Sequence, residues 1–205
     1  MKLTEAKLKQ LIREVLGKGM KTASDLPKGV SITVATLKSG TIDVFYSDTE
    51  TGNILSYEGE SKPYGMIAMD MEPQLGDEYP CLEAFMVAYS DAGKGWGPLL
   101  YDVSMEVATI LGGGLVSDRS IVSTDAYKVW DTYDSKKRDD VKKVQLDNEE
   151  DSFKNGTQDD CVQNIAFDYS QIKGVPWSET PVSKLYKKQP TTLKALGNKL
   201  RVVGF

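Results

Sequence analysis

Hydrophobic and polar residues alternate over residues 30–71 with a period of two, which is typical of β-strands that have one buried face. The alternation predicts four strands, at 30–34, 42–46, 54–57 and 65–71. Turns such as Ser39-Gly40 leave no room for crossover helices between these strands, so the pattern predicts an antiparallel meander. A fifth segment, at 82–89, is almost wholly apolar, which predicts a central strand buried on both faces.

Two segments after this strand have the spacing of helices. In residues 99–111 apolar side chains recur at intervals of three and four, and the three glycines at 112–114 end the predicted helix. A short strand is predicted at 115–116. A second helix then begins at Ser123 or Thr124, either of which is a suitable N-cap.

The rest of the body completes the predicted fold. Residues 134–160 are strongly polar and predict the end of a surface helix followed by a long loop. Strand patterns return at 162–169 and 200–205. Together these elements predict an α/β (α+β) fold with a mixed, mostly antiparallel central sheet flanked by helices.

The N-terminal residues look like an appendage to this body. Residues 1–17 predict an amphipathic helix of about three turns, a length that is marginal unless the apolar face docks on a partner. Its apolar positions are Leu8, Leu11, Ile12, Val15 and Leu16. We therefore predict a docking or targeting helix at 1–17, a linker at 18–29 and one domain at 30–205.

Composition excludes several classes of protein. The chain of 205 residues contains no run near the roughly 20 apolar residues that a membrane span requires. It has no histidine, which removes histidine-dependent triads and histidine metal sites. Its two cysteines make neither a disulfide scaffold nor a zinc cluster, which favours a reducing compartment.

Charge is unevenly distributed along the chain. The net charge is +4 in residues 1–28, −15 in residues 29–180 and +6 in residues 181–205. An acidic body argues against a general nucleic-acid-binding protein, whose basic surface should dominate. Either the basic ends lie against the acidic body or in solvent, or one of them is a docking segment.

Three alternate glycines, Gly93, Gly95 and Gly97, join the predicted central strand to the next helix, and Pro98 suits the first turn of that helix. Glycine lets the backbone approach a ligand closely, and free amides at a helix N-terminus favour phosphate. The spacing fits neither a Walker loop nor a Rossmann fingerprint. The segment is therefore either an anion-binding loop or only a tight turn.

The order of these elements resembles the GNAT family of acyl-CoA-dependent N-acetyltransferases, in which a central strand, a pyrophosphate loop and a helix follow one another. The resemblance covers about residues 30–135 and implies a GNAT-like fold that uses acetyl-CoA as the acyl donor. It implies that the CoA pyrophosphate is held by Gly93, Lys94, Gly95, Trp96 and Gly97. The splayed end of the strand at 82–89 would pair with pantetheine, and the amide near Val87 would polarise the thioester carbonyl.

Transfer to an amine, on a protein or a small molecule, requires a base. Glu83 is the candidate, because apolar neighbours on the central strand would raise the pKa of its carboxyl group; alternatively it is exposed or pairs with a lysine. The family commonly places a tyrosine, as general acid, where this chain has Trp130. Tyr127 and Tyr133, one turn to either side, are the candidate substitutes.

The opening residues 1–14 resemble the short N-terminal helices of proteins from large tailed bacteriophages, and residues 12–14 fit the loose pattern that phage head-maturation proteases cut. This resemblance implies phage structural proteins as partners of residues 1–17, and a location in the host cytoplasm or on the virion.

Two hypotheses follow. The first is an enzyme that transfers an acetyl group from acetyl-CoA to an amine, which the three retained glycines favour. The second is a non-catalytic GNAT-fold component of a phage virion or head-assembly complex, docked through its N-terminal helix. The absence of the family's usual arginine or glutamine before the glycines, and of its tyrosine, favours the second.

Overall fold

The computed structural model describes residues 21–55, 63–71, 84–93, 95–118, 122–135, 138–146, 175 and 179–204. In these residues the chain forms a mixed, mostly antiparallel sheet of eight strands with helices packed against it. The predicted fold class is confirmed at this level. No helix among these residues is long and apolar enough to cross a membrane.

The first four strands form an antiparallel meander, in which the first three correspond to the strands predicted at 30–34, 42–46 and 65–71 and the fourth to the segment predicted at 82–89. They are β1 (Val30–Thr36), β2 (Ile42–Asp48), β3 (Gly65–Met71) and β4 (Phe85–Ala92). The turn between β1 and β2 contains Gly40 with a φ of 92°, a left-handed conformation that favours glycine. Along β2, Ile42, Val44 and Tyr46 are buried and alternate with half-buried residues, because one face of the sheet packs into the core.

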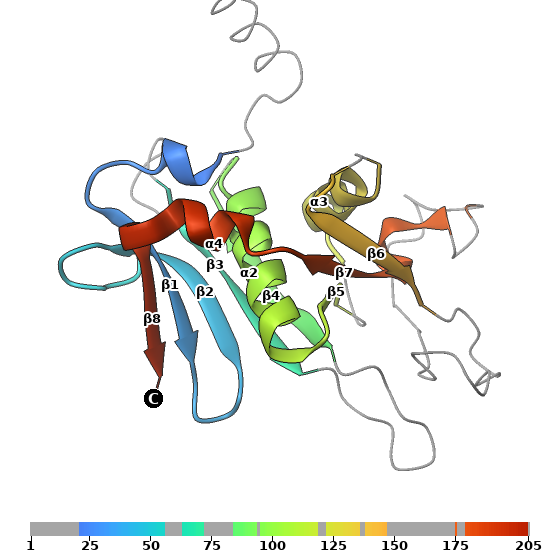
Figure 1. The fold of residues 1–205 in the computed structure, drawn as a ribbon, viewed down its shortest axis with the longest axis horizontal. Coiled ribbons are helices and arrows are strands. Elements are labelled where there is room, and N and C mark those ends of the chain that lie inside the picture. Colours follow the sequence, from blue (N-terminus) through green and yellow to red (C-terminus); the bar gives the residue numbers. More distant parts are fainter. Residues whose placement is uncertain are drawn as a thin grey trace, which may run out of the picture.

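The other four strands come from segments far apart in the chain. They are β5 (Leu115–Val116), β6 (Val141–Gln145), β7 (Lys184–Lys188) and β8 (Leu200–Gly204). β5 runs parallel to β4, β7 lies antiparallel between β5 and β6, and β8 runs parallel to β1. The strand order is therefore β6-β7-β5-β4-β3-β2-β1-β8, and the chain passes from β7 to the opposite edge of the sheet before it forms β8 (Figure 1).

Helices pack on this sheet and close the core. They are α2 (Gly97–Gly112), α3 (Thr124–Ser135) and α4 (Thr191–Leu196), with 3-10 turns η1 (Ala23–Asp25), η3 (Pro181–Ser183) and η4 (Gly197–Lys199). Figure 1 shows α2 crossing the sheet with α4 beside it. Trp130 of α3 is buried against Tyr101 of α2 and Tyr186 of β7, with ring centroids 5.3 Å and 5.1 Å apart, so an aromatic cluster joins these three elements.

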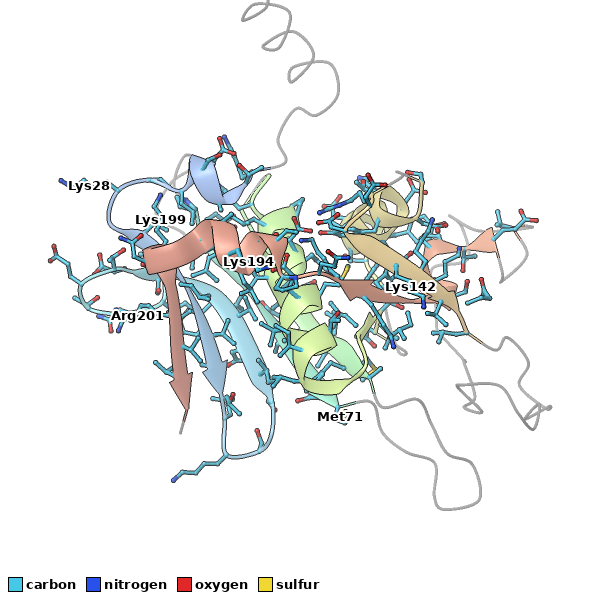
Figure 2. The ribbon with its side chains drawn as sticks, viewed as in Figure 1. Lys28, Met71, Lys142, Lys194, Lys199 and Arg201 are labelled. Carbon is cyan, nitrogen blue, oxygen red and sulfur yellow. The ribbon has the colours of Figure 1, made fainter. Side chains whose placement is uncertain are left out.

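Both basic ends, where they are described, lie against the body. In the predicted linker, Ala23 and Leu26 are buried in the core. Figure 2 shows Lys199 and Arg201 at the same end of the molecule as Lys28. The Lys199 ammonium donates to the carbonyl of Leu26 at 2.8 Å, and the Arg201 guanidinium donates to a carbonyl in the turn after β2 at 2.9 Å. The C-terminal basic segment is therefore engaged with the fold rather than extended into solvent.

Several expectations need correction, and others lie outside the described residues. The polar stretch expected to hold only a helix end and a loop contains the edge strand β6, whose two lysines, Lys142 and Lys143, obscure its alternation. In the strand expected at 54–57, the described residues form one isolated bridge, from Ile54 to Ser47. β7 and α4 were not predicted. The helix at 1–17 and the strand at 162–169 lie outside the described residues.

A buried ion pair joins α2 to β7. The side chains of Glu106 and Lys188 are both fully buried, and the ammonium donates to the carboxylate. The same carboxylate accepts the backbone N–H groups of Thr192 and Leu193, each at 2.7 Å. The first residues of α4 have no side-chain cap of their own, so Glu106 satisfies amides that the helix leaves unpaired.

Asp140 extends this network. Its carboxylate lies 3.0 Å from the Lys188 ammonium and 3.0 Å from the guanidinium of Arg138. Burial alone would raise the pKa of Asp140, but the hydrogen bonds and charges of these two cations outweigh it and hold the pKa well below its usual range. The fold therefore stabilises Asp140 in its ionised form.

We expect Asp140→Asn to lower the free energy of unfolding more at neutral pH than in acid. A carboxyl group whose pKa is depressed by folding contributes stability that is complete above its unfolded pKa, about 3.9, and is lost as the pH falls through the folded pKa. The difference between variant and wild type should therefore shrink below about pH 4. Urea unfolding of both proteins at about pH 7 and about pH 3 measures it, and a pH-independent difference would contradict the assignment.

Candidate functional site

The sheet opens between β4 and β5. These strands pair only through Phe85–Leu115 and Met86–Val116. Beyond this point Ser117 turns toward η3, where its hydroxyl donates to the carbonyl of Val182 at 3.3 Å. Within the described residues, the edge of β4 that faces β5 therefore has no strand partner from Val87 onward.

β4 also changes its register at the opening. Its pairing with β3 skips Ala88, which is an extra residue in the strand and forms a β-bulge. Residues 88–91 are exposed, although β4 lies inside the sheet. The expectation that the strand at 82–89 is buried on both faces is therefore wrong for Ala88 and Tyr89.

The glycine loop after β4 is held by its neighbours. Three hydrogen bonds fix it: Gly93 N–H to the Tyr64 carbonyl at 3.0 Å, Lys21 N–H to the Gly95 carbonyl at 3.1 Å, and the Tyr46 hydroxyl to the Trp96 carbonyl at 2.8 Å. The indole of Trp96 is buried and packs edge-on against the ring of Tyr46, 5.5 Å away. Gly95 has a φ of 84°, which residues with a side chain rarely adopt. The protein itself therefore sets the shape of the loop.

Amides at the end of the loop are available to a ligand. No side chain caps the N-terminus of α2, and among the described residues no acceptor is found for the N–H groups of Gly95 and Gly97. Gly97 has no positive φ, and a Cβ there would lie an ordinary 3.6 Å from the Cβ of Ala92. At Gly93, by contrast, a Cβ would lie 2.6 Å from the ring of Tyr64. The described fold does not require a glycine at 97, whereas close approach of an anion to the backbone would.

A cavity of about 610 Å³ lies in front of this loop. The N-termini of two helices contribute to its wall, through Gly97 and Pro98 of α2 and through Ser123 and Ala126 at the start of α3. The positive ends of two helix dipoles therefore face one space, which favours a negatively charged ligand.

The charged side chains around this cavity have both signs. Asp91 and Asp125 line it, and Asp125 forms an exposed ion pair with Lys128 at 2.9 Å. The ammonium of Lys21 lies 5.5 Å from the ring of Trp96, beside the loop. Backbone amides and helix dipoles, rather than a cluster of cations, are therefore the main features that would attract an anion among the described residues.

A second cavity, of about 200 Å³, extends into the opening between β4 and β5. Its wall includes Val87 and Ser90 of β4, Tyr101 of α2, Asp118 after β5 and the buried Trp130 of α3. Ser90, Tyr101, Ser123 and Ala126 also line the larger cavity, so the two spaces meet at these residues. The site is thus a cleft that runs from the loop into the sheet.

The structure brings together most of the predicted donor-binding residues. Four of them line the two cavities: Val87, Gly93, Gly95 and Gly97. Trp96 is buried beneath the loop and supports it. Lys94 and the predicted base Glu83 lie outside the described residues.

Neither predicted tyrosine lines these cavities. The Tyr133 hydroxyl is buried and donates to the Asp102 carboxylate at 2.7 Å, and burial, followed by the charge of Asp102, raises its pKa well above the usual value. This contact ties α3 to the first turns of α2. Tyr127 is half-buried on α3, and burial followed by the charges of Asp131 and Asp134 raises its pKa. The role of either residue as general acid stays a prediction.

Tyr101 and Ser90 are cleft residues that the sequence did not single out. Tyr101 occupies an apolar position of the helix, one turn after the last loop glycine, where its ring predicts only packing. The signal that could have identified it is a tyrosine in the first turns of the helix that follows the glycine loop. For Asp118, which follows the two-residue strand β5, the sequence predicts an ion pair with Arg119 that closes the cleft, or a purely structural role; Arg119 lies outside the described residues.

Comparison of the chain with protein-family models, curated proteins and solved structures gives no match. Among the described residues there is also no group of three or more acidic or cysteine side chains that could hold a metal ion.

Proposed function

We propose that this chain is a GNAT-type N-acyltransferase that transfers an acetyl group from acetyl-CoA to an amine. The observation that carries the proposal is the opening of the sheet between β4 and β5, which leads to a cavity at the uncapped N-terminus of α2. Backbone groups at such an opening need hydrogen-bond partners. An extended ligand with amides along its length and a diphosphate at one end would supply partners in both places.

The residues of the cleft fit such a donor. When bound, acetyl-CoA supplies the activated acyl group as a thioester. The amides of Gly95 and Gly97 would hold the diphosphate, and the unpaired edge of β4 would bind the amides of the pantetheine arm. The Val87 N–H, at the start of the opening, would stabilise negative charge on the thioester oxygen.

Transfer also requires the amine to lose a proton. The amine nitrogen bonds to the carbonyl carbon, the carbon–sulfur bond breaks, the nitrogen gives up a proton and the sulfur takes one. Asp91 and Asp118 line the cleft, where their carboxylates would attract a protonated amine and accept its proton. Glu83 remains the base that the sequence predicts, and a lysine side chain or a small polyamine is the acceptor class that an acidic cleft would favour.

We expect Gly97→Ala to weaken acetyl-CoA binding at least about tenfold while leaving stability unchanged or slightly raised. The fold has room for the added methyl group, but the methyl group would hold a diphosphate away from the loop amides. Gly204→Ala on β8 is the matched control, because a Cβ there meets nothing within 4 Å. Calorimetric titration of acetyl-CoA into all three proteins, with thermal unfolding in parallel, measures both properties.

Two results would overturn the proposal. If the wild type gives no heat at millimolar acetyl-CoA, the protein does not bind the proposed donor. If the wild type and Gly97→Ala bind acetyl-CoA with equal affinity, the glycine loop is not the binding site.

A second candidate is a non-catalytic component of a phage virion or head-assembly complex, docked through its N-terminal helix, whose cleft would at most bind an acyl-CoA without transferring the acyl group. The observation that favours it is that neither Tyr127 nor Tyr133 lines the cleft. The two functions differ in turnover: release of free CoA from acetyl-CoA in the presence of a polyamine supports the enzyme, and tight binding without release supports the second candidate.

A further inference from the structure

The phenol of Tyr101 lies where the two cavities meet. Its side chain projects from α2 between the glycine loop and the opening in the sheet, and it lines both spaces. The residue as a whole is 3% exposed, and its ring is fixed edge-on against Trp130. The tyrosine is therefore a rigid part of the cleft wall, with its hydroxyl at the junction of the two cavities.

The hydrogen bonds of this hydroxyl are incompletely satisfied by the protein. It donates to the Ser90 hydroxyl at 3.2 Å, which is long for a bond between two oxygens. A phenol oxygen can also accept, and a serine hydroxyl that accepts one proton still has its own to donate. Within the described part of the chain, no other residue donates a hydrogen bond to the Tyr101 oxygen or accepts one from the Ser90 hydroxyl. Ser90 is itself exposed on β4, so its proton faces the cleft.

The same stretch of β4 lacks its strand partner. Ser90 is four residues past Met86, the last β4 residue that pairs with β5. It lies three residues before Gly93, where the loop begins. A ligand that extends from the loop along β4 therefore passes beside Ser90 and Tyr101, which line both cavities.

We propose that the Tyr101–Ser90 hydroxyl pair binds an amide of the donor's extended arm, and so makes the cleft selective for a complete acyl-CoA over its nucleotide portion. The inference rests on the proposed function. An amide carbonyl would accept from one hydroxyl and an amide N–H would donate to the other, in place of the long bond between them. The glycine loop would then contribute affinity for the diphosphate, and the hydroxyl pair would set the position of the arm relative to Val87.

Tyr101→Phe and Ser90→Ala test this pair, with CoA and 3′-phosphoadenosine 5′-diphosphate as ligands. The second ligand contains the nucleotide and diphosphate of CoA but lacks the arm. We expect Tyr101→Phe to weaken CoA binding about fivefold to tenfold, as loss of one hydrogen bond does, without changing the affinity for the nucleotide. Ser90→Ala should have a similar effect, and because Ser90 is exposed this variant does not depend on the core tolerating the change. The double variant should weaken CoA binding by less than the product of the two single effects, because both changes remove the same interaction.

The possible results separate the two proposals. Unchanged CoA affinity in both variants overturns the role of the hydroxyl pair while leaving the loop as the donor site. Equal weakening of both ligands also overturns it, because the variants would then act through the loop. If the wild type binds neither ligand, the proposed function is wrong, and the role of the hydroxyl pair is wrong with it.

Discussion

Replacement of Lys188 by methionine is expected to lower the free energy of unfolding by about 3–5 kcal/mol, the typical effect of removing one partner of a buried ion pair. Methionine preserves much of the side-chain volume, so the loss comes mainly from the charge. It would leave the Glu106 carboxylate fully buried beside Asp140, with only the amides and hydroxyl at the start of α4 as partners. Urea unfolding at neutral pH measures the change.

Lys128→Met is the matched control for this experiment. Lys128 also pairs with a carboxylate, that of Asp125, but both side chains are exposed, so removal of the pair should have little measurable effect. The double variant Glu106→Leu/Lys188→Met should recover part of the loss, because the fully buried carboxylate that lost its cation is then removed as well. If Lys188→Met is as stable as Lys128→Met, the buried pair does not hold α2, β7 and α4 together.

Gly65→Ala is expected to destabilise the protein by about 3 kcal/mol or more and to abolish binding in the cleft. Gly65 begins β3 with a φ of 133°, and a Cβ there would lie 2.5 Å from the Cα of Ala92 and 2.5 Å from the Asp91 carbonyl oxygen. Both contacts are with backbone, which cannot rotate away as a side chain can. The end of β4 would have to move, and the glycine loop moves with it. Urea unfolding and acetyl-CoA titration measure the two effects.

Gly40→Ala is the control that distinguishes the cost of an unfavourable backbone conformation from the cost of a steric clash. Gly40 has a φ of 92° but nothing within 4 Å of an added Cβ, so this variant carries only the penalty of an unfavourable backbone conformation, about 1–2 kcal/mol. It also lies in the β1–β2 turn, and ligand affinity should be unchanged. Equal destabilisation by the two substitutions would show that the close approach of β3 to β4 is not what requires glycine at 65.

The parts of the fold that the sequence predicted are those in which local pattern and burial agree. β2 and β3 have one core-facing side, and in β1 apolar residues alternate with Ser31 and Thr33, which are themselves buried, so a period of two is visible. α2 combines an apolar face with Pro98 and closing glycines. β6 and β7 were missed because their lysines interrupt the pattern. Lys188 is fully buried only because Glu106, 82 residues earlier in the chain, receives its charge. No local rule anticipates such a partner.

In the cleft, too, the features with a local sequence pattern could be predicted and those that depend on distant segments could not. Alternate glycines before a helix are a local signal, and the structure places Gly93, Gly95 and Gly97 along one cavity. The opening of the sheet is not local, because it depends on where β5 stops and on the turn of Ser117 toward η3. Tyr101 becomes a cleft residue only through this opening, and for this reason its ring could be predicted only as part of the core.

The path of the chain from β7 through α4 to β8 has a consequence for biosynthesis. This segment supplies a neighbour to β5 in one half of the sheet and to β1 in the other, and its residues are the last described ones to leave the ribosome. Until they emerge, the nascent protein carries two strands whose hydrogen-bonding edges lack their final neighbours. The half of the sheet that contains β5 can therefore be completed only after β7 has been synthesised, and the half that contains β1 only after β8 has.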